Sequence, residues 1–280
     1  MQLLVLATVT AAQLPQSWSF KTGPTPTVNV ANILGPITVE GVSGETVTVE
    51  ATVSGGTDAE RARWSVEVVG DGGSVHARVC CGSSCTAGGG QGDRCNDGVL
   101  VKLTLRVPKG SRLEAHGVSS VVAARGVSTV HAHSVSGNVR VAAAADVEAD
   151  TVSGHVEVRD AAGPARVRTV SGDASVSSAS SAPRLELHSV SGRLEFAGVC
   201  ADGCRVTAHT TSGDLRLQMA PASGFDLRFQ SQSGDLHDEL SMATKSRRHF
   251  VGTEVEARYG KGGGNIEVTS VSGDLEVKKR

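Results

Sequence analysis

Apolar and polar residues alternate strictly along much of the chain, in short runs that end at a Ser-Gly pair. Seven of these runs align without gaps on the pair, at intervals of 17 to 21 residues and one last interval of 39. Their serines are Ser136, Ser153, Ser171, Ser191, Ser212, Ser233 and Ser272. Alternation with a period of two is typical of β-strands that bury one face. The pattern therefore predicts a repeated unit of two short strands joined at Ser-Gly.

Two columns of apolar residues mark the buried face of these units. The column six residues before the Ser holds Val130, Val147, Ala165, Leu185, Val206, Leu227 and Ile266. The column four residues before it holds Ala132, Ala149, Val167, Leu187, Ala208, Phe229 and Val268. Alternation resumes after the Gly, and only Asp238 interrupts the last apolar column. An eighth, degenerate copy runs from Leu113 to Ala124.

Repeats of this length cannot bury a core alone, so the units should stack on one another. In-register parallel stacking brings equivalent side chains to about 5 Å, the spacing of neighbouring strands, where like charges repel. The outward column five residues before the Ser reads His131, Glu148, Arg166, Glu186, Thr207 and Arg228, with no like charges in successive units. A β-meander of hairpins would show similar alternation but would not bring these positions together. We therefore predict an all-β fold, a β-solenoid with an N-terminal β cap.

Each unit also carries a hydroxyl two residues before the Ser, on the inward phase of the alternation. These residues are Ser134, Thr151, Thr169, Ser189, Thr210, Ser231 and Ser270. A buried hydroxyl without a partner costs about 1–3 kcal/mol, so we expect the stacked hydroxyls to hydrogen-bond one another. The Gly after the Ser, for example Gly172, is expected to supply the positive φ of a sharp corner.

The units divide the chain into three parts. Residues 28–112 are expected to form the N-terminal β cap with a Cys-rich loop, and residues 113–280 the β-solenoid array. Residues 238–265 interrupt the array and contain a Gly-rich run, 260–264, expected to be a flexible loop. Residues 1–12 form a short apolar run ending in small residues, which indicates a possible signal peptide, although no Lys or Arg precedes it.

Six Cys residues support export, because an even number in an exported chain is typical of disulfides. Four lie in the Gly-rich loop, namely Cys80, Cys81, Cys85 and Cys95. Cys200 and Cys204 flank Ala-Asp-Gly and are expected to close one turn. The alternative is zinc bound by the four-Cys loop, whose spacing fits no standard zinc pair.

Composition narrows the classes of partner. The net charge of −2 gives no general attraction to nucleic acid. No segment is apolar for long enough to cross a bilayer. Aromatic residues make up 3% of the chain, with two Trp and one Tyr, so the platforms on which sugars stack are scarce. We expect no cofactor, and as partner an unknown cell-surface or envelope component.

One outward column concentrates acidic residues. The residue after Ser-Gly is Asp214, Asp235 and Asp274 in three units. Neighbouring carboxylates could hold Ca²⁺ or act as the acid pair of a glycosidase, whereas the plainer interpretation is that they close turns. His188 and His209 also occupy equivalent outward positions and could stack as a metal pair. We expect no catalytic or cofactor-binding residue and treat the Asp column as a weak metal candidate.

Three stretches together resemble a bacterial β-strand-repeat family of unknown function that is labelled "putative adhesin". They are Gly35-Pro36-Ile37-Thr38-Val39, Leu105-Arg106-Val107-Pro108 and the recurrent Ser-Gly-Asp-Leu units. The resemblance covers roughly residues 28–280. It implies a β-solenoid associated with the cell envelope and offers no catalytic residues to transfer.

The sequence thus predicts a protein that binds without turning anything over. Secretion, the periplasm or the cell surface is the expected location, with an adhesin or a surface structural or binding protein as the expected class. Two alternatives stay open: an enzyme acting on polysaccharide, and a regulatory module of envelope stress.

Overall fold

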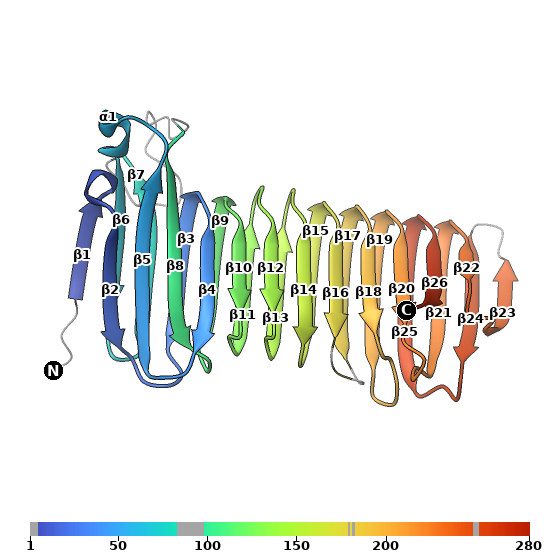
Figure 1. Cartoon of the computed structure of the whole chain (residues 1–280). Helices are drawn as coiled ribbons and strands as arrows, with labels where there is room; N and C mark the ends of the chain where they lie inside the picture. The colour runs from blue at the N-terminus through green and yellow to red at the C-terminus, as the bar shows by residue number, and fades with distance from the viewer. Residues whose placement is uncertain (1–4, 83–97, 179, 181–182, 249–251) are drawn as a thin grey trace. The chain divides into compact units, whose positions relative to one another are not determined.

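The computed structural model describes residues 5–82, 98–178, 180, 183–248 and 252–280. The chain divides into two compact units, Met1–Arg140 and Val141–Arg280. Nearly every element in both units is a β-strand (Figure 1). The boundary between the two units falls within β12 (Val139–Ala142).

The first unit combines parallel coils with antiparallel strands. Its parallel strands are β3 (Thr27–Leu34), β9 (Arg112–Ser119) and β11 (Thr129–Ser134) in one sheet, and β4 (Ile37–Val42) and β10 (Val122–Arg125) in the other. The degenerate copy from Leu113 to Ala124 therefore forms a coil that pairs with the coil of residues 27–42.

Antiparallel strands flank these coils. They are β1 (Val5–Thr10), β2 (Gln16–Lys21), β5 (Thr46–Ser54), β6 (Trp64–Gly70), β7 (Ser74–Cys81) and β8 (Leu100–Pro108). β7 pairs in parallel with β3, and β8 pairs in parallel with β4. Each of the two sheets therefore contains both antiparallel and parallel strands. A 3-10 helix (Ala11–Gln13) and the short helix α1 (Asp58–Arg61) complete the unit. Residues 5–10, inside the expected signal peptide, form β1 and pair with β6.

The second unit is a stack of parallel coils, each with one strand in each of two sheets. One sheet contains β13 (Asp146–Thr151), β15 (Ala165–Ser171), β17 (Arg184–Ser191), β19 (Arg205–Ser212), β25 (Gly264–Ser272) and β21 (Phe225–Ser233). The other contains β14 (Val156–Ala161), β16 (Ala174–Ser178), β18 (Leu194–Gly198), β20 (Leu215–Met219), β26 (Leu275–Lys279) and β22 (Leu236–Asp238). These neighbours pair in parallel, and only the β14–β16 pair shows a register shift, between Val158 and Ala161. The parallel pairing confirms the predicted solenoid and excludes a meander here.

The order of the coils departs from the order of the sequence. The coil β25–β26 lies between β19–β20 and β21–β22 and pairs with both. Residues 238–265 bring the chain to that place through β23 (Ala243–Arg248) and β24 (Thr253–Tyr259), antiparallel strands beyond β21. The segment expected only to interrupt the array therefore adds two strands to its sheet.

The Gly-rich run 260–264 makes the crossing from β24 to β25. Gly260, Gly262 and Gly263 have φ of 59°, 75° and 106°, values that favour glycine. Gly264 already belongs to β25, and its N–H donates to the carbonyl oxygen of Gly224 at 3.0 Å. The run is thus a defined crossing over β21 with left-handed backbone, where the sequence analysis expected only a flexible loop.

The inward columns form the core of the second unit. Leu187, Phe196, Phe229 and Ile266 are fully buried. Asp238, the residue that breaks the last apolar column, ends β22 at the edge of its sheet. Its two carboxylate oxygens accept hydrogen bonds from the backbone N–H groups of Leu240 and Met242, at 2.8 and 2.6 Å. An inward carboxylate is tolerated there because it binds the turn that leaves the stack.

The glycine of Ser-Gly is required for a different reason from the one predicted. Gly172 does not have a positive φ, and only Gly192 and Gly273 of this column in the second unit do. A Cβ on Gly172 would lie 1.9 Å from the carbonyl oxygen of Gly154 in the preceding coil. Coils approach so closely at this corner that no side chain fits.

The hydroxyl column is buried and in register, but most of its members lack the predicted hydrogen bonds among the described residues. Within the described part of the chain, five of its members have no hydrogen-bond partner: Thr169, Ser189, Thr210, Ser231 and Ser270. Neighbouring strands lie about 4.8 Å apart, whereas a hydroxyl bond needs about 2.8 Å. Equivalent side chains on straight parallel strands therefore do not reach one another. In the first unit, Ser134 instead donates to the carbonyl oxygen of Ser120 at 3.3 Å.

Candidate functional site

The three candidate aspartates lie on adjacent coils, in the spatial order Asp214, Asp274, Asp235. Two of the carboxylates, Asp214 and Asp274, each accept a backbone hydrogen bond from the next coil. The N–H of Asp274 donates to Oδ1 of Asp214 at 3.2 Å, and the N–H of Asp235 donates to Oδ1 of Asp274 at 2.9 Å. Asp173 binds the N–H of Arg193 in the same way at 2.8 Å. The column therefore ties successive turns together.

A hollow of about 400 Å³ lies beside this column. It is lined by Arg193, Asp214, Leu215, Arg216, His237, Glu239, Asp274 and Glu276. Its strongest contact is an ion pair between Nε of Arg216 and Oε2 of Glu276 at 2.6 Å. Hydrogen bonds from Arg216, and then from Lys278, lower the pKa of Glu276. A general acid needs the opposite shift, so this carboxylate is suited to an ion pair.

Metal ligands do not converge in this region. Among the residues that the structure describes, no group of three or more His, Cys, Asp or Glu side chains could hold a metal ion. The Asp column thus stays a weak metal candidate, because one oxygen of Asp214 and one of Asp274 already accept backbone N–H groups.

The outward charges alternate in sign across the coils of the second unit. In the spatial order of the strands, one column reads Glu148, Arg166, Glu186, Thr207, Glu267, Arg228, Glu256 and Lys245. Nε of Arg166 lies 2.6 Å from Oε2 of Glu186. Exposed ion pairs add little to stability, so their main effect is to favour one neighbour over another.

The position of the inserted coil also gives Arg216 an acidic neighbour. Glu276 lies between Arg216 and His237 on the second sheet. Stacking in sequence order would instead place Arg216 directly beside His237. This order was not predicted from the sequence, although two signals of it were present, namely the charges of this column and the inward Asp238.

Two histidine pairs stack on outer faces. The rings of His188 and His209 have centroids 5.1 Å apart, and those of His116 and His133 in the first unit have centroids 5.3 Å apart. Burial, and then the neighbouring imidazole, lowers the pKa of both His188 and His116. The structure thus brings His188 and His209 together as stacked rings.

One surface feature escaped the sequence analysis. The residue just before the Ser of Ser-Gly is a half-exposed valine in four coils of the second unit. Val152, Val170, Val190 and Val271 are 46, 45, 49 and 43% exposed, and we call them the valine stripe. Thr211 and Gln232 occupy the same column in the remaining coils. The signal was the recurrent Val-Ser-Gly, in which an apolar residue takes an outward position.

A disulfide closes the turn that precedes β19 and contacts the start of the inserted coil. Cys200 and Cys204 are joined by a disulfide, with their Cα atoms 5.3 Å apart. The carbonyl oxygen of Cys204 accepts the N–H of Asn265, at the start of β25. Cys80 and Cys81 are also disulfide-bonded, whereas Cys85 and Cys95 lie outside the described residues.

Comparison with known proteins gives one family and two similar structures. Residues 88–278 match the model of the family described as Toastrack DUF4097. A "putative cell adhesion protein" from Clostridium sporogenes is 9% identical, covers 95% of this chain and 100% of its own, and has a TM-score of 0.25. A "Putative lipid binding protein" from Parabacteroides distasonis is 12% identical, covers 97% and 99%, and has a TM-score of 0.44. No curated protein matches the chain. No helix among the described residues is long and apolar enough to cross a membrane.

Proposed function

The chain belongs to the Toastrack DUF4097 family, and from that premise we propose that it is a non-catalytic protein of the cell envelope or the secreted fraction. In this role it binds a surface component and turns nothing over. The location and the class of partner rest on this proposal.

The valine stripe carries the proposal. The outward charges described above pair with neighbouring coils, and the Asp column binds backbone N–H groups. The stripe instead repeats a half-exposed apolar side chain from coil to coil. Regular apolar positions on a solvent-facing edge are typical of surfaces that bind a partner.

The binding test compares the native chain with Val170→Ser/Val190→Ser. Both proteins are immobilised and exposed to envelope fractions, and bound material is quantified. We expect the double variant to retain much less. Ala197→Ser, an apolar-to-hydroxyl change on the outward face of the other sheet, is the matched control and should bind as the native chain does. Equal capture by all three proteins contradicts the proposal.

The alternative of a polysaccharide-acting enzyme is tested separately. The native chain is assayed with plant, algal and bacterial polysaccharides in the presence of Ca²⁺, alongside Asp214→Asn/Asp235→Asn. Asparagine keeps an acceptor oxygen for the N–H of the neighbouring coil, so the stack is preserved. Cleavage that disappears in the double variant would establish an enzyme. We expect no cleavage by either protein.

A further inference from the structure

The strand β23 is the outermost strand of its sheet. It pairs with β24 on one side, in antiparallel register from Ala243 to Arg248. Figure 1 shows it at the end of the strand order beyond β24. An outermost strand presents unpaired N–H and C=O groups, which form a template for a further strand.

The side chains of β23 are exposed on both faces. Residues 243–247 are exposed at every position, whereas strands inside the stack bury alternate positions. A strand without a covering layer gains little by apolar burial. What binds beside it must be held by backbone hydrogen bonds and by charges.

Positive charge marks the outer face of this edge. Lys245 lies opposite Glu256, and Arg247 lies opposite Glu254. Glu254 is already bound by Arg228, whose Nη2 lies 2.6 Å from its Oε1. Lys245 and Arg247 make no ion pair or side-chain hydrogen bond within the described ranges. The column of alternating outward charge therefore ends on Lys245, and Arg247 adds a second cation on the same edge strand.

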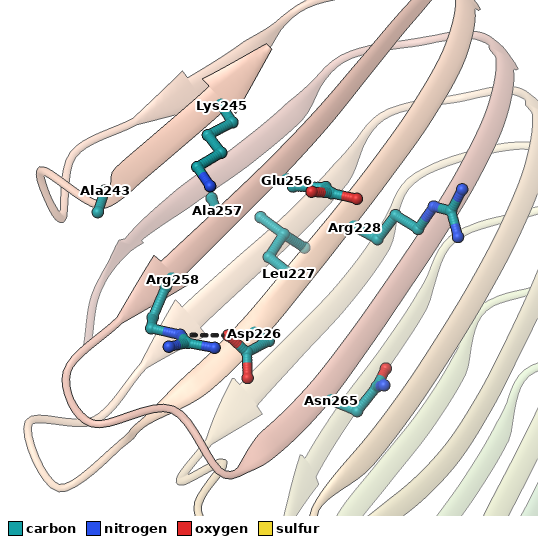
Figure 2. Close-up of a pocket in the computed structure, with 9 residues that line it drawn as sticks. All are labelled: Asp226, Leu227, Arg228, Ala243, Lys245, Glu256, Ala257, Arg258 and Asn265. Carbon is teal, nitrogen blue, oxygen red and sulfur yellow. Dashed lines mark hydrogen bonds and ion pairs between the residues drawn. The ribbon is translucent and has the colours of Figure 1, made fainter. Parts of the chain in front are cut away.

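Lys245 also borders a hollow of about 460 Å³ on the outer face. Figure 2 shows its side chain extending beside Ala257 toward the hollow, with Glu256 and Arg228 farther along. Arg258 is held by Asp226, with its Nε 2.6 Å from Oδ1. Of the three cations in this hollow, Lys245 is the one left for an incoming group.

We propose that the free edge of β23 accepts an extended segment of a partner protein with acidic residues at alternate positions. The segment would add one strand to the sheet, and its carboxylates would lie opposite Lys245 and Arg247. This continues the alternation of charge that orders the coils. The surface is separate from the valine stripe, so the two proposals can fail independently.

A second copy of this chain does not fit the same edge. Two β23 strands side by side would place Lys245 and Arg247 of one beside those of the other, and like charges across a strand pair are destabilising. Basic residues on an edge strand therefore exclude self-pairing while favouring an acidic strand.

The experiment uses the full chain and two synthetic peptides. One has the sequence Thr-Glu-Val-Glu-Ala-Glu-Val, and the other replaces each Glu with Lys. Fluorescence anisotropy measures their affinities, and hydrogen exchange locates the protected amides. We expect the acidic peptide to bind at least about tenfold more tightly, because two attractive pairs replace two repulsive ones. Binding should protect residues 243–247.

The charge-reversed variant Lys245→Glu/Arg247→Glu should exchange the preference, so that the basic peptide binds more tightly. Equal affinities for both peptides, no binding of either, or protection confined to another part of the chain would each overturn the proposal. So would self-association of the native chain in sedimentation that protects β23, because the occupant would then be a second copy.

Discussion

Gly172 shows how closely neighbouring coils approach at the corner of each unit. Its missing Cβ leaves room for the carbonyl oxygen of Gly154. A Cβ added to Gly213 or Gly234 would likewise lie 2.1 or 2.2 Å from the carbonyl oxygen of a glycine in the neighbouring coil. The repeated glycine is thus required by a close contact between coils, which the sequence of a single turn does not show.

Gly172→Ala should lower the free energy of unfolding by about 1–3 kcal/mol, because the added methyl group forces two coils apart. Urea denaturation measures the change. Gly73→Ala is the control, since a Cβ at Gly73 meets nothing nearer than an oxygen of Asp71 at 3.8 Å. Equal losses in the two variants would contradict close approach as the cause.

Thr169 represents the buried hydroxyls without partners. It is 5% exposed, and its Oγ1 has no hydrogen-bond partner among the described residues. Thr169→Val should therefore leave the unfolding free energy unchanged or raise it by up to about 1 kcal/mol. In contrast, Ser134→Ala removes a donor to Ser120 and should lower it by about 0.5–1.5 kcal/mol. Destabilisation by Thr169→Val in thermal melts would show that the hydroxyl has a partner.

Among the elements, β17 and β19 carry the stacked pair of His188 and His209. Because the pKa of His188 is lowered in the folded state, the unfolded chain takes up a proton first as the pH falls. The contribution of His188 is complete above about pH 6.5 and is lost below it. Its neighbours are Arg168 on β15, Glu186 on its own strand and His209 on β19.

Stability measured by urea denaturation should therefore fall between pH 7.5 and pH 5.5, and it should fall less in His188→Gln. The residual dependence in the variant reports His116, whose pKa is lowered in the same direction. A variant that keeps the full pH dependence of the native chain would assign the effect to other groups.

Outward charge favours the observed neighbours of the inserted coil. Glu276→Lys would place a cation directly beside Arg216 and remove the carboxylate between Arg216 and His237. We expect faster hydrogen exchange in β26 and β22 while β14 and β16 stay unchanged. Arg216→Glu added to this variant should restore the protection, since one opposite-charge pair is regained. Uniform exchange across the unit would instead indicate global destabilisation.

For the molecule as a whole, alternation predicted the strands, the parallel stacking and the inward columns. Each of these follows from the side-chain period of a strand, which local sequence encodes. The neighbour of a given coil is not encoded locally, because Leu227 and Ile266 suit the same inward position equally well. Only the outward pair Arg216 and Glu276 and the edge residue Asp238 distinguished the two orders. The strand β23 was missed because it buries neither face and so lacks alternation.

The family resemblance drawn from the early Gly-Pro and Ser-Gly segments is confirmed, since residues 88–278 match the family model. The valine stripe was open to prediction, because Val-Ser-Gly recurs at a position that the alternation places outward. The backbone hydrogen bonds accepted by Asp214 and Asp274 could not be predicted, because they depend on which coils are neighbours in the stack.

The interleaved coil sets an order of events during folding. In a solenoid whose coils follow the sequence, structure can spread from each coil to the next. Here β19 can pair with its native neighbour β25 only after residues far along the chain have folded, because Arg205 pairs with Asn265. Until then the coil β21–β22 can pair with the free edge of β19–β20. Its inward residues match those of β25–β26, so this misplaced pairing is a kinetic trap. Refolding followed by pulsed hydrogen exchange should show β13–β18 protected early and β25–β26 protected in a separate slow phase.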